Sequence, residues 1–273
     1  IYVFMKIWKN TNTLNGYDVG LNFTNDKCLA DIAILGSKPF KLLEFPKLKG
    51  IFRVGIGKEN IPAKMASDKN ILVRFPSQET IEIIYNETAS FTCSLIFKML
   101  YSTVGDINKW IKYERTELSR KSLLVIGNGN IGQRVADYMA PFMKVCTYDI
   151  AVDAVESLNN LIRAADCITL HIPMIKENNS FMCEDKLALM KDNAVLINTS
   201  RGSIVDETAL YKEIPTNRLR ASFDVYWQEP YYGKLSKFYP DRFYMTPHIA
   251  STCSGFLKGC RVGVDNLIKE IKL

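Results

Sequence analysis

Short apolar segments alternate with helical patterns from residue 121 onward, and this alternation restricts the fold more than any other feature of the chain. The helical patterns are predicted at about 131–140, 153–164, 184–190 and 206–213. The apolar segments are SLLVI, KVCTY, CITLHI, AVLINT, ASFDVY and RFYMTPH. Strands that alternate with helices form parallel sheets, because each helix carries the chain back to start the next strand in the same direction. The sequence therefore predicts an α/β domain built on a doubly wound parallel sheet.

A glycine-rich turn joins the first of these strands to the first helix, in the stretch LLVIGNGNIGQRV. A pyrophosphate at a helix N-terminus needs a tight turn, a close approach to the backbone and a helix packed hard against its strand. Gly127, Gly129 and Gly132 supply these three conditions in order. The residues predicted to line a dinucleotide here are Gly127, Gly129, Asn130, Ile131 and Gly132. A GxGxxG pattern by itself also fits an ordinary turn between a strand and a helix.

The following strand, KVCTY, ends at Asp149. This is the spacing at which a carboxylate accepts hydrogen bonds from the adenosine ribose hydroxyls of a bound dinucleotide. A carboxylate there also repels a 2′-phosphate, so the sequence favours NAD over NADP. A solvated Asp149 beside an ordinary turn is the alternative.

The first ninety residues show a different sequence pattern. Short strand candidates, separated by Asn, Gly and Pro, are YVFMKIW, YDVGLNF, ADIAIL, GIFRVG and ILVRF. They predict a second, smaller α/β unit. Residues 87–104 are apolar on nearly every face and predict a helix buried between domains or subunits. Residues 256–271 keep a helical spacing of apolar positions and are expected to pack back on the N-terminal unit.

Composition excludes several classes of function. The net charge of +6 comes from basic residues interleaved with acidic ones, which does not favour a nucleic-acid partner. The apolar opening IYVFMKIW is too short to cross a membrane. The seven cysteines are scattered without metal-ligand spacing. We therefore expect no metal site and a reducing, cytoplasmic location.

Three polar residues follow predicted strands at positions suited to redox chemistry. Arg201 lies in VLINTSRG, Glu229 in ASFDVYWQEP and His248 in MTPHIAS. Ligand sites of parallel sheets form at the C-terminal ends of strands, so these side chains are expected at one edge. Reduction of a carbonyl by a nicotinamide requires a proton donor, a group that orients the donor, and a cation for the substrate. His171, the other histidine, is interpreted as a structural or cofactor-lining residue.

The order of these motifs resembles that of the D-isomer-specific 2-hydroxyacid dehydrogenase family over most of the chain. The motifs are IGNGNIG, AADCITLHIP, LINTSRGSIVDETAL, FDVYWQEP and TPHIAS. The resemblance implies an NAD-dependent oxidoreductase that interconverts a 2-oxo acid and a D-2-hydroxy acid. It makes Arg201 the substrate-binding cation, His248 the general acid/base and Glu229 the carboxylate that orients His248.

The resemblance also implies further contacts and an assembly. Pro173, Thr199 and Asp224 are expected to contact the cofactor, and the backbone amides of Val54, Gly55 and Ile56 to receive the substrate's carboxylate. The family's architecture is a Rossmann domain, here 88–248, with a smaller, discontinuous flavodoxin-like substrate domain, here 1–87 and 249–273. The two crossings near residues 88 and 248 would form a hinge. A homodimer joined mainly by the cofactor domains is expected.

Two alternatives remain open. One is an NAD-sensing regulatory binding protein of the same fold. The other is a dehydrogenase specific for a phosphorylated acid such as 3-phosphoglycerate. The loop after GIFRVG contains GKEN, with Lys58 where the family usually has a small apolar residue before an acid–Asn pair. This difference leaves the identity of the substrate open.

Overall fold

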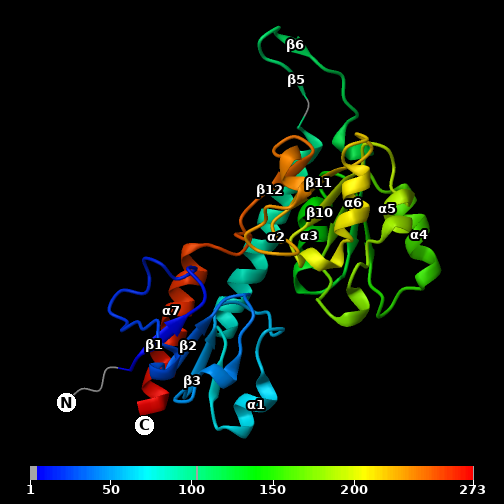
Figure 1. The fold of residues 1–273 in the computed structure, drawn as a ribbon. Coiled ribbons are helices and arrows are strands. Elements are labelled where there is room, and N and C mark those ends of the chain that lie inside the picture. Colours follow the sequence, from blue (N-terminus) through cyan, green and yellow to red (C-terminus); the bar gives the residue numbers. More distant parts are fainter. Residues whose placement is uncertain (1–4, 103, 273) are drawn as a thin grey trace. The chain divides into compact units, whose positions relative to one another are not determined.

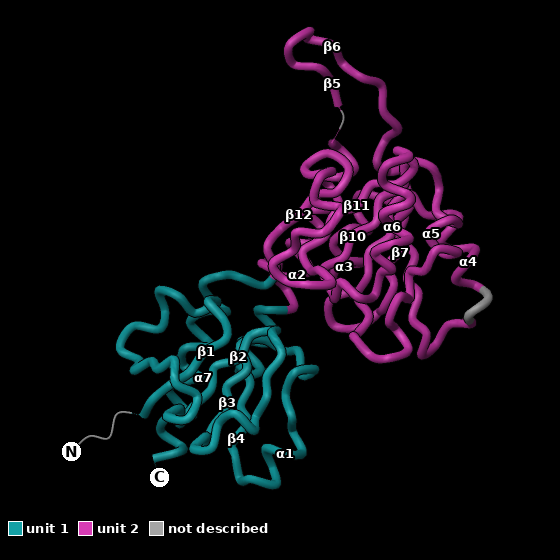
Figure 2. Tube along the Cα trace, in the orientation of Figure 1, with its two compact units in different colours: residues 1–84, 251–273 teal, residues 85–250 magenta. Residues whose placement is uncertain are grey.

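The protein divides into two compact units, shown in Figure 2. The computed structural model describes residues 5–102 and 104–272. Unit 1 consists of residues 1–84 and 251–273, and unit 2 of residues 85–250. Each unit is built on its own parallel sheet, so the predicted α/β fold class is confirmed.

Unit 1 contains a four-stranded parallel sheet in the order β1-β2-β3-β4. Its strands are β1 (Ile7–Lys9), β2 (Ile32–Leu35), β3 (Gly50–Arg53) and β4 (Leu72–Arg74). Helix α7 (Ser254–Lys272) packs on one face, where Phe256, Val264 and Leu267 contact Ile7 and Phe52 in a single core. Helix α1 (Ala63–Asp68) contributes Ala66 to a second core on the other face.

The strand expected over residues 17–23 does not form, and this prediction is wrong. Gly16 and Gly20 adopt φ values of +86° and +82°, and these left-handed residues turn the backbone away from an extended path. Only Phe23 forms an isolated bridge, to Ile7. The strand expected over 2–8 corresponds to β1, although residues 1–4 lie outside the described residues.

Unit 2 contains a six-stranded parallel sheet in the order β12-β11-β10-β9-β7-β8. The strands are β7 (Ser122–Ile126), β8 (Lys144–Tyr148), β9 (Cys167–Leu170), β10 (Val195–Asn198), β11 (Arg220–Phe223) and β12 (Phe243–Met245). The helices are α3 (Asn130–Met139), α4 (Val155–Ala164), α5 (Glu184–Leu189) and α6 (Glu207–Glu213). The strand order reverses between β7 and β9, and this switch point is where open α/β sheets bind ligands.

Alternate residues of the unit 2 strands enter two cores on opposite faces of the sheet. Leu124 and Ile126 pack with residues of α4, α5 and α6, whereas Leu123 and Val125 pack with residues of α2 and α3. Helices therefore cover both faces, which explains why β7, β9 and β10 are buried along nearly their whole length, whereas the edge strand β8 is mostly exposed.

Helix α2 runs from Gln78 to Leu100 and therefore starts earlier and ends sooner than the expected 87–104. Tyr101, Ser102 and Val104 lie beyond the helix, and residue 103 lies outside the described residues. Ala89, Cys93, Ile96 and Met99 enter the core of unit 2, while Ser90, Ser94 and Lys98 are exposed. Ser90, Ser94 and Lys98, four residues apart, form a solvated side of the helix, whereas Thr88 and Thr92 are buried with the side that packs into the core of unit 2.

A short antiparallel hairpin, β5 (Gly105–Asp106) with β6 (Ile111–Lys112), extends from unit 2 in Figure 1. We call residues 104–117 the arm. Its exposed apolar side chains are Val104, Ile107, Trp110, Ile111 and Tyr113, with Trp110 78% exposed. An isolated two-stranded hairpin is marginally stable in water at best.

Candidate active site

The glycine turn sits at the switch point of the unit 2 sheet and leaves no room for side chains at two positions. Gly127 follows β7 with a φ of +95°, and a Cβ there would lie 2.6 Å from the carbonyl oxygen of His171. A Cβ on Gly132 would lie 1.9 Å from the carbonyl oxygen of Gly127. These two glycines bring α3 tightly against its strand.

Gly129, by contrast, faces open space, since a Cβ there would meet no atom within 4 Å. It occupies the N-cap of α3 without a side chain to cap the helix, and Asn130 and Ile131 form the first turn. The first amides of a helix point outward and attract anions. This cradle therefore fits a dinucleotide pyrophosphate.

Asp149 follows β8 and is held beside the glycine turn. Its Oδ2 accepts a hydrogen bond from the Asn128 amide at 2.9 Å, and its Oδ1 accepts one from the Ala151 amide at 3.0 Å. The carboxylate is thus fixed by backbone groups at the end of the strand that neighbours β7. This is the position in which it can receive the ribose hydroxyls.

The other three predicted cofactor contacts lie after β9, β10 and β11. Pro173 is exposed, whereas the Thr199 hydroxyl lies 2.9 Å from that of Thr92 in α2. The buried carboxylate of Asp224 accepts hydrogen bonds from the Thr246 hydroxyl and from the amides of residues 249 and 250, at 2.6 to 2.9 Å. Thr199 and Asp224 already bind protein groups, and their roles toward the cofactor stay predictions.

His248 and Glu229 form a close pair at the same edge of the unit 2 sheet. The Nδ1 atom of His248 lies 3.0 and 2.9 Å from the two carboxylate oxygens of Glu229. The two side chains are 36% and 29% exposed, so the pair faces solvent on one side. Because Nδ1 is bound to the carboxylate, Nε2 is the ring nitrogen that can exchange a proton with a substrate.

The environment keeps Glu229 ionised. Burial raises the pKa of Glu229, but the hydrogen bond and charge of His248, the Tyr226 amide and the charge of Arg201 together outweigh burial. The pKa of Glu229 is therefore held below its ordinary value of 4.5. The carboxylate accepts the Nδ1 proton throughout the neutral range.

Arg201 follows β10 and completes the group of predicted catalytic residues in unit 2. Its Nη1 donates to the Ser200 carbonyl at 2.7 Å, and its own carbonyl accepts a hydrogen bond from Asn198 Nδ2 at 2.9 Å. Its charge contributes to the lowered pKa of Glu229. The structure thus places Arg201, Glu229 and His248 together after successive strands, while their roles stay predictions.

The predicted carboxylate-binding amides follow β3 in unit 1. The Val54 amide donates to the Leu35 carbonyl at 2.9 Å, and the Gly55 amide binds the buried thiol of Cys260. Of the three amides, only that of Ile56 has no hydrogen-bond partner among the described residues. Ile56 is therefore the member of the trio best able to receive a ligand.

His171 is separate from this chemistry. Burial lowers the pKa of His171 to about 3, so its ring stays neutral, and Nε2 lies 2.9 Å from the Thr169 hydroxyl. The carbonyl group of His171 packs directly against Gly127. The structural interpretation of His171 fits these contacts.

Sequence reasoning did not single out two further residues at this edge. The buried Asn198 binds the carbonyl of Arg201 and the backbone and hydroxyl of Ser200. Tyr226 hydrogen-bonds both to Glu229 and to Thr246. Both residues lie within the motifs quoted above, but their neighbours are visible only in the folded chain.

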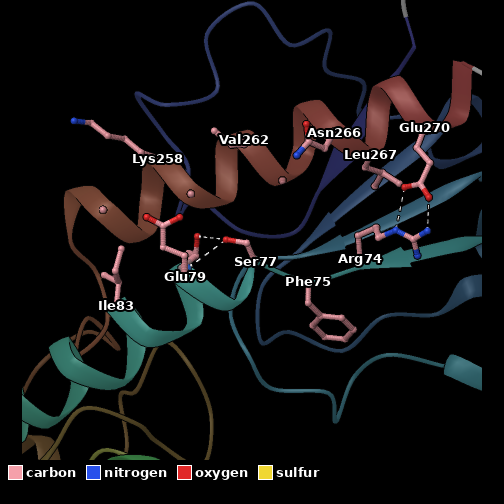
Figure 3. A pocket seen from close by; sticks show the side chains of 14 residues that line it. Arg74, Phe75, Ser77, Glu79, Ile83, Lys258, Val262, Asn266, Leu267 and Glu270 are labelled. Carbon is pink, nitrogen blue, oxygen red and sulfur yellow. Dashed lines mark hydrogen bonds and ion pairs between the residues drawn. The ribbon is translucent and has the colours of Figure 1, made fainter.

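Unit 1 also contains a surface groove of about 520 Å³, shown in Figure 3. It is bounded by α7 and by the first turns of α2. Arg74 and Glu270 form an ion pair at one end. Phe75, Ile83 and Leu267 supply much of its apolar lining. The groove contains none of the predicted site residues.

Several general features of the described residues bear on the class of protein. No helix among them is both long enough and apolar enough to span a membrane. All seven cysteines are free thiols. Within the same residues, no cluster of three or more His, Cys, Asp or Glu side chains could hold a metal ion.

A dinucleotide cradle, a carboxylate after the second strand and a histidine–carboxylate pair define a class of nicotinamide-dependent α/β proteins. Comparison with known proteins identifies the family within this class. Residues 101–250 match the family described as "D-isomer specific 2-hydroxyacid dehydrogenase, NAD binding domain". The chain belongs to this family. The predicted family, the dehydrogenase class and NAD as the cofactor are confirmed.

Individual relatives share about a third of their aligned residues with the chain. The hydroxypyruvate reductase of Thermotoga maritima is 31% identical over 238 residues, which is 82% of this chain and 77% of that protein. The D-3-phosphoglycerate dehydrogenase of Methanocaldococcus jannaschii is 32% identical over 204 residues. That alignment spans 67% of this chain but only 38% of the length of that relative.

A solved structure shows the same fold. D-lactate dehydrogenase from Aquifex aeolicus, crystallised with NAD and lactic acid, superposes with a TM-score of 0.77. The match covers 98% of this chain and 95% of the other, at 24% sequence identity. The likeness establishes that the two-unit α/β architecture recurs in that protein.

Proposed function

We propose that this protein is an NAD-dependent dehydrogenase that interconverts a 2-oxo acid and a D-2-hydroxy acid. The observation that carries the proposal is the His248–Glu229 pair, with Nδ1 2.9 Å from a carboxylate oxygen, at the sheet edge that also carries the glycine cradle. A histidine held in this way exchanges a proton at Nε2.

Each residue has a distinct task in this proposal. Bound NAD supplies the acceptor or donor for the hydride. His248 donates a proton to the substrate's carbonyl oxygen in reduction and removes it in oxidation. Glu229 orients the ring and stabilises its charged form. Arg201 binds the carboxylate and carbonyl oxygen through its planar guanidinium, which presents two donors at once.

The proposed cofactor site uses three features of unit 2. The first amides of α3 bind the pyrophosphate beside Gly127, Gly129 and Gly132. Asp149 binds the ribose hydroxyls and selects against a 2′-phosphate. Asp224 is proposed to contact the nicotinamide amide, and Pro173 and Thr199 to line the cofactor.

The proposed domains are a cofactor domain, residues 88–248, and a substrate domain, residues 1–87 with 249–273. The substrate's carboxylate would bind at the loop Val54–Ile56, chiefly through the Ile56 amide. Two connections join the units, one inside α2 and one just before α7. Closure about these connections would exclude water from the reacting atoms.

We also propose that the protein is a homodimer in the cytoplasm. The arm supports a dimer, because its apolar side chains are exposed in the single chain. The seven free thiols are consistent with a reducing compartment.

A screen of 2-oxo acids with NADH tests the function. Glyoxylate, hydroxypyruvate and pyruvate are compared with phosphohydroxypyruvate, each at saturating NADH, by the loss of absorbance at 340 nm. We expect turnover of at least one unphosphorylated acid. Exclusive use of the phosphorylated acid would shift the assignment to the phosphoglycerate class, and NADH binding without any turnover would favour a regulatory binding protein.

A further inference from the structure

The loop that carries His248 has an unusual backbone. His248 adopts a φ of +55°. This left-handed conformation costs a residue with a side chain free energy, so it persists only where the surrounding structure holds it. Its amide donates to the Thr246 carbonyl at 3.0 Å, across Pro247. Some group must therefore hold Thr246 in place.

Tyr226 reaches Thr246 from the end of β11. Its hydroxyl lies 2.9 Å from the Thr246 carbonyl oxygen and 2.7 Å from that of Phe223, and it accepts a hydrogen bond from the Thr246 amide at 3.0 Å. Burial raises the pKa of Tyr226, so the hydroxyl keeps its proton and remains a donor. The phenol ring stacks on Tyr231, with ring centroids 5.0 Å apart.

The same residue binds the other member of the pair. The Tyr226 amide donates to Glu229 Oε1 at 3.3 Å, the oxygen that lies 3.0 Å from His248 Nδ1. A closed circuit of hydrogen bonds results. It runs from the His248 ring to Glu229, through Tyr226 to Thr246, and back to the His248 amide.

We propose that Tyr226 is a positioning residue that holds His248 and Glu229 in one fixed geometry. This inference rests on the proposed function, in which His248 is the acid/base. The hydrogen bonds of Tyr226 go to protein groups, and its proposed contribution to catalysis passes through the orientation of the imidazole. Phenylalanine would fill the same space but could not reach Thr246 with a hydrogen bond.

The substitution Tyr226→Phe tests the proposal without endangering the fold. The Thr246 amide keeps its bond to the Phe223 carbonyl, and the Thr246 carbonyl keeps that from His248, so no backbone group is stranded. We expect kcat to fall by on the order of tenfold, while KM and NADH binding stay within about twofold.

Tyr231→Phe is the matched control. Its hydroxyl also donates to a protein oxygen, Glu207 Oε1 at 2.7 Å, and accepts an amide hydrogen bond from Leu235. It has no link to Thr246. Tyr231→Phe should lower the free energy of unfolding by an amount similar to that of Tyr226→Phe and leave kcat unchanged. An equal fall of kcat in both variants would overturn the proposal.

A spectroscopic measurement decides the matter independently of turnover. The chain has two histidines, so selective ¹⁵N-histidine labelling yields two rings, and His248→Asn identifies which signal belongs to His248. We expect the signal of the Nδ1 proton, bound to Glu229, to shift or broaden in Tyr226→Phe and not in Tyr231→Phe. An unchanged signal in Tyr226→Phe would refute the inference, whatever happens to kcat.

The two hypotheses fail differently. If the wild-type protein reduces no 2-oxo acid, the proposed function fails, and the Nδ1 signal still decides whether Tyr226 fixes the pair. If the wild type is active and Tyr226→Phe retains full kcat, the positioning role fails while the function stands.

Discussion

At the scale of single residues, His248 combines a reactive ring with a left-handed backbone. Asparagine tolerates positive φ better than most residues, so His248→Asn removes the imidazole at little backbone cost. We expect kcat to fall by about 10² to 10⁴, the usual contribution of a general acid/base. NADH binding, followed by quenching of tryptophan fluorescence, should remain nearly normal. Turnover close to that of the wild type would remove His248 from the mechanism.

The proposed role of Asp149 in the choice of cofactor can be tested in the same local way. Its carboxylate is fixed beside the glycine turn by the amides of Asn128 and Ala151, and in the proposed function it repels a 2′-phosphate. Asp149→Ser should narrow the preference for NADH over NADPH, measured as the ratio of the two kcat/KM values. Asp137→Ser, a change at an exposed carboxylate of α3, is the control and should leave this ratio unchanged. A wild type that uses NADPH as well as NADH would contradict the role given to Asp149.

At the scale of elements, helix α7 lies very close to strand β3. A Cβ added at Gly263 would come within 2.4 Å of the buried Phe52 ring, whereas one at Gly255 would meet only the flexible end of Ile83, at 3.1 Å. Overpacking of a rigid core costs about 1–3 kcal/mol. Gly263→Ala should therefore lower the free energy of unfolding, and Gly255→Ala should leave it equal or higher.

Urea unfolding of both variants provides the measurement for α7. The same residue change in the same helix separates packing from helix propensity, which favours alanine by roughly 1 kcal/mol at an interior position. If Gly263→Ala were at least as stable as Gly255→Ala, the close contact with Phe52 would not limit the helix.

Asp166 joins two elements of unit 2 and should make stability depend on pH. Its carboxylate accepts from the amide and hydroxyl of Ser122, at the start of β7, and from Lys191 Nζ, at 2.8 to 3.0 Å. Burial raises the pKa of Asp166, but these partners outweigh burial and hold it below 3.8. The stabilisation is present above the unfolded pKa and disappears as pH falls through the lower, folded value.

The expected cost of Asp166→Asn is about 1 kcal/mol at pH 7, since the site is partly solvated. The difference from the wild type should shrink as the pH falls below 3.8, where the wild-type carboxyl gains its proton. Asp192→Asn, a change at an exposed carboxylate nearby, is the control. A difference that stays constant down to pH 3 would mean that charge at Asp166 contributes nothing.

The helices and strands that the sequence predicts best are those whose side chains are buried. Strands β7 to β10 were predicted to within two residues. For β7, β9 and β10 the reason is burial, because a parallel strand covered by helices on both faces is largely apolar, whereas the edge strand β8 is mostly exposed. Residues 17–23 also contain apolar side chains, but Asp18, Gly20 and Asn22 interrupt them, and Gly16 and Gly20 turn the chain there. The ends of α2 could not be read from apolar content, since its first two turns mix Glu and Thr with isoleucine.

The candidate site was predictable for a geometric reason. Carboxyl ends of parallel strands share one edge, so Arg201, Glu229 and His248 were expected together from strand positions alone. Tyr226 could not be recognised in the same way. A tyrosine after an apolar strand is ordinarily a core aromatic, and only the folded loop reveals its hydrogen bonds to Thr246.

At the scale of the whole molecule, the arm should determine the state of association. Trp110 is 78% exposed, and its neighbour Ile107 is 74% exposed on the same hairpin. Replacing both with serine should convert a dimer into a 31.1 kDa species in light scattering at micromolar concentration. Tyr232→Ser, a change at an 87% exposed residue elsewhere in unit 2, should not do so. A wild type that is already monomeric would refute the proposed dimer.

The discontinuity of unit 1 also imposes an order on biosynthesis. Strands β1 to β4 leave the ribosome before unit 2, but the helix that covers their face, with Phe256, Val264 and Leu267, leaves after it. All of unit 2 is synthesised in between, which takes on the order of ten to thirty seconds at ordinary rates of translation. During that interval Ile7, Ile32 and Phe52 have no covering helix, and unit 2 can fold before unit 1. The nascent chain therefore exposes the apolar face of β1 to β3 until α7 has been synthesised, and a chaperone that binds exposed apolar surface would act on unit 1 during this interval.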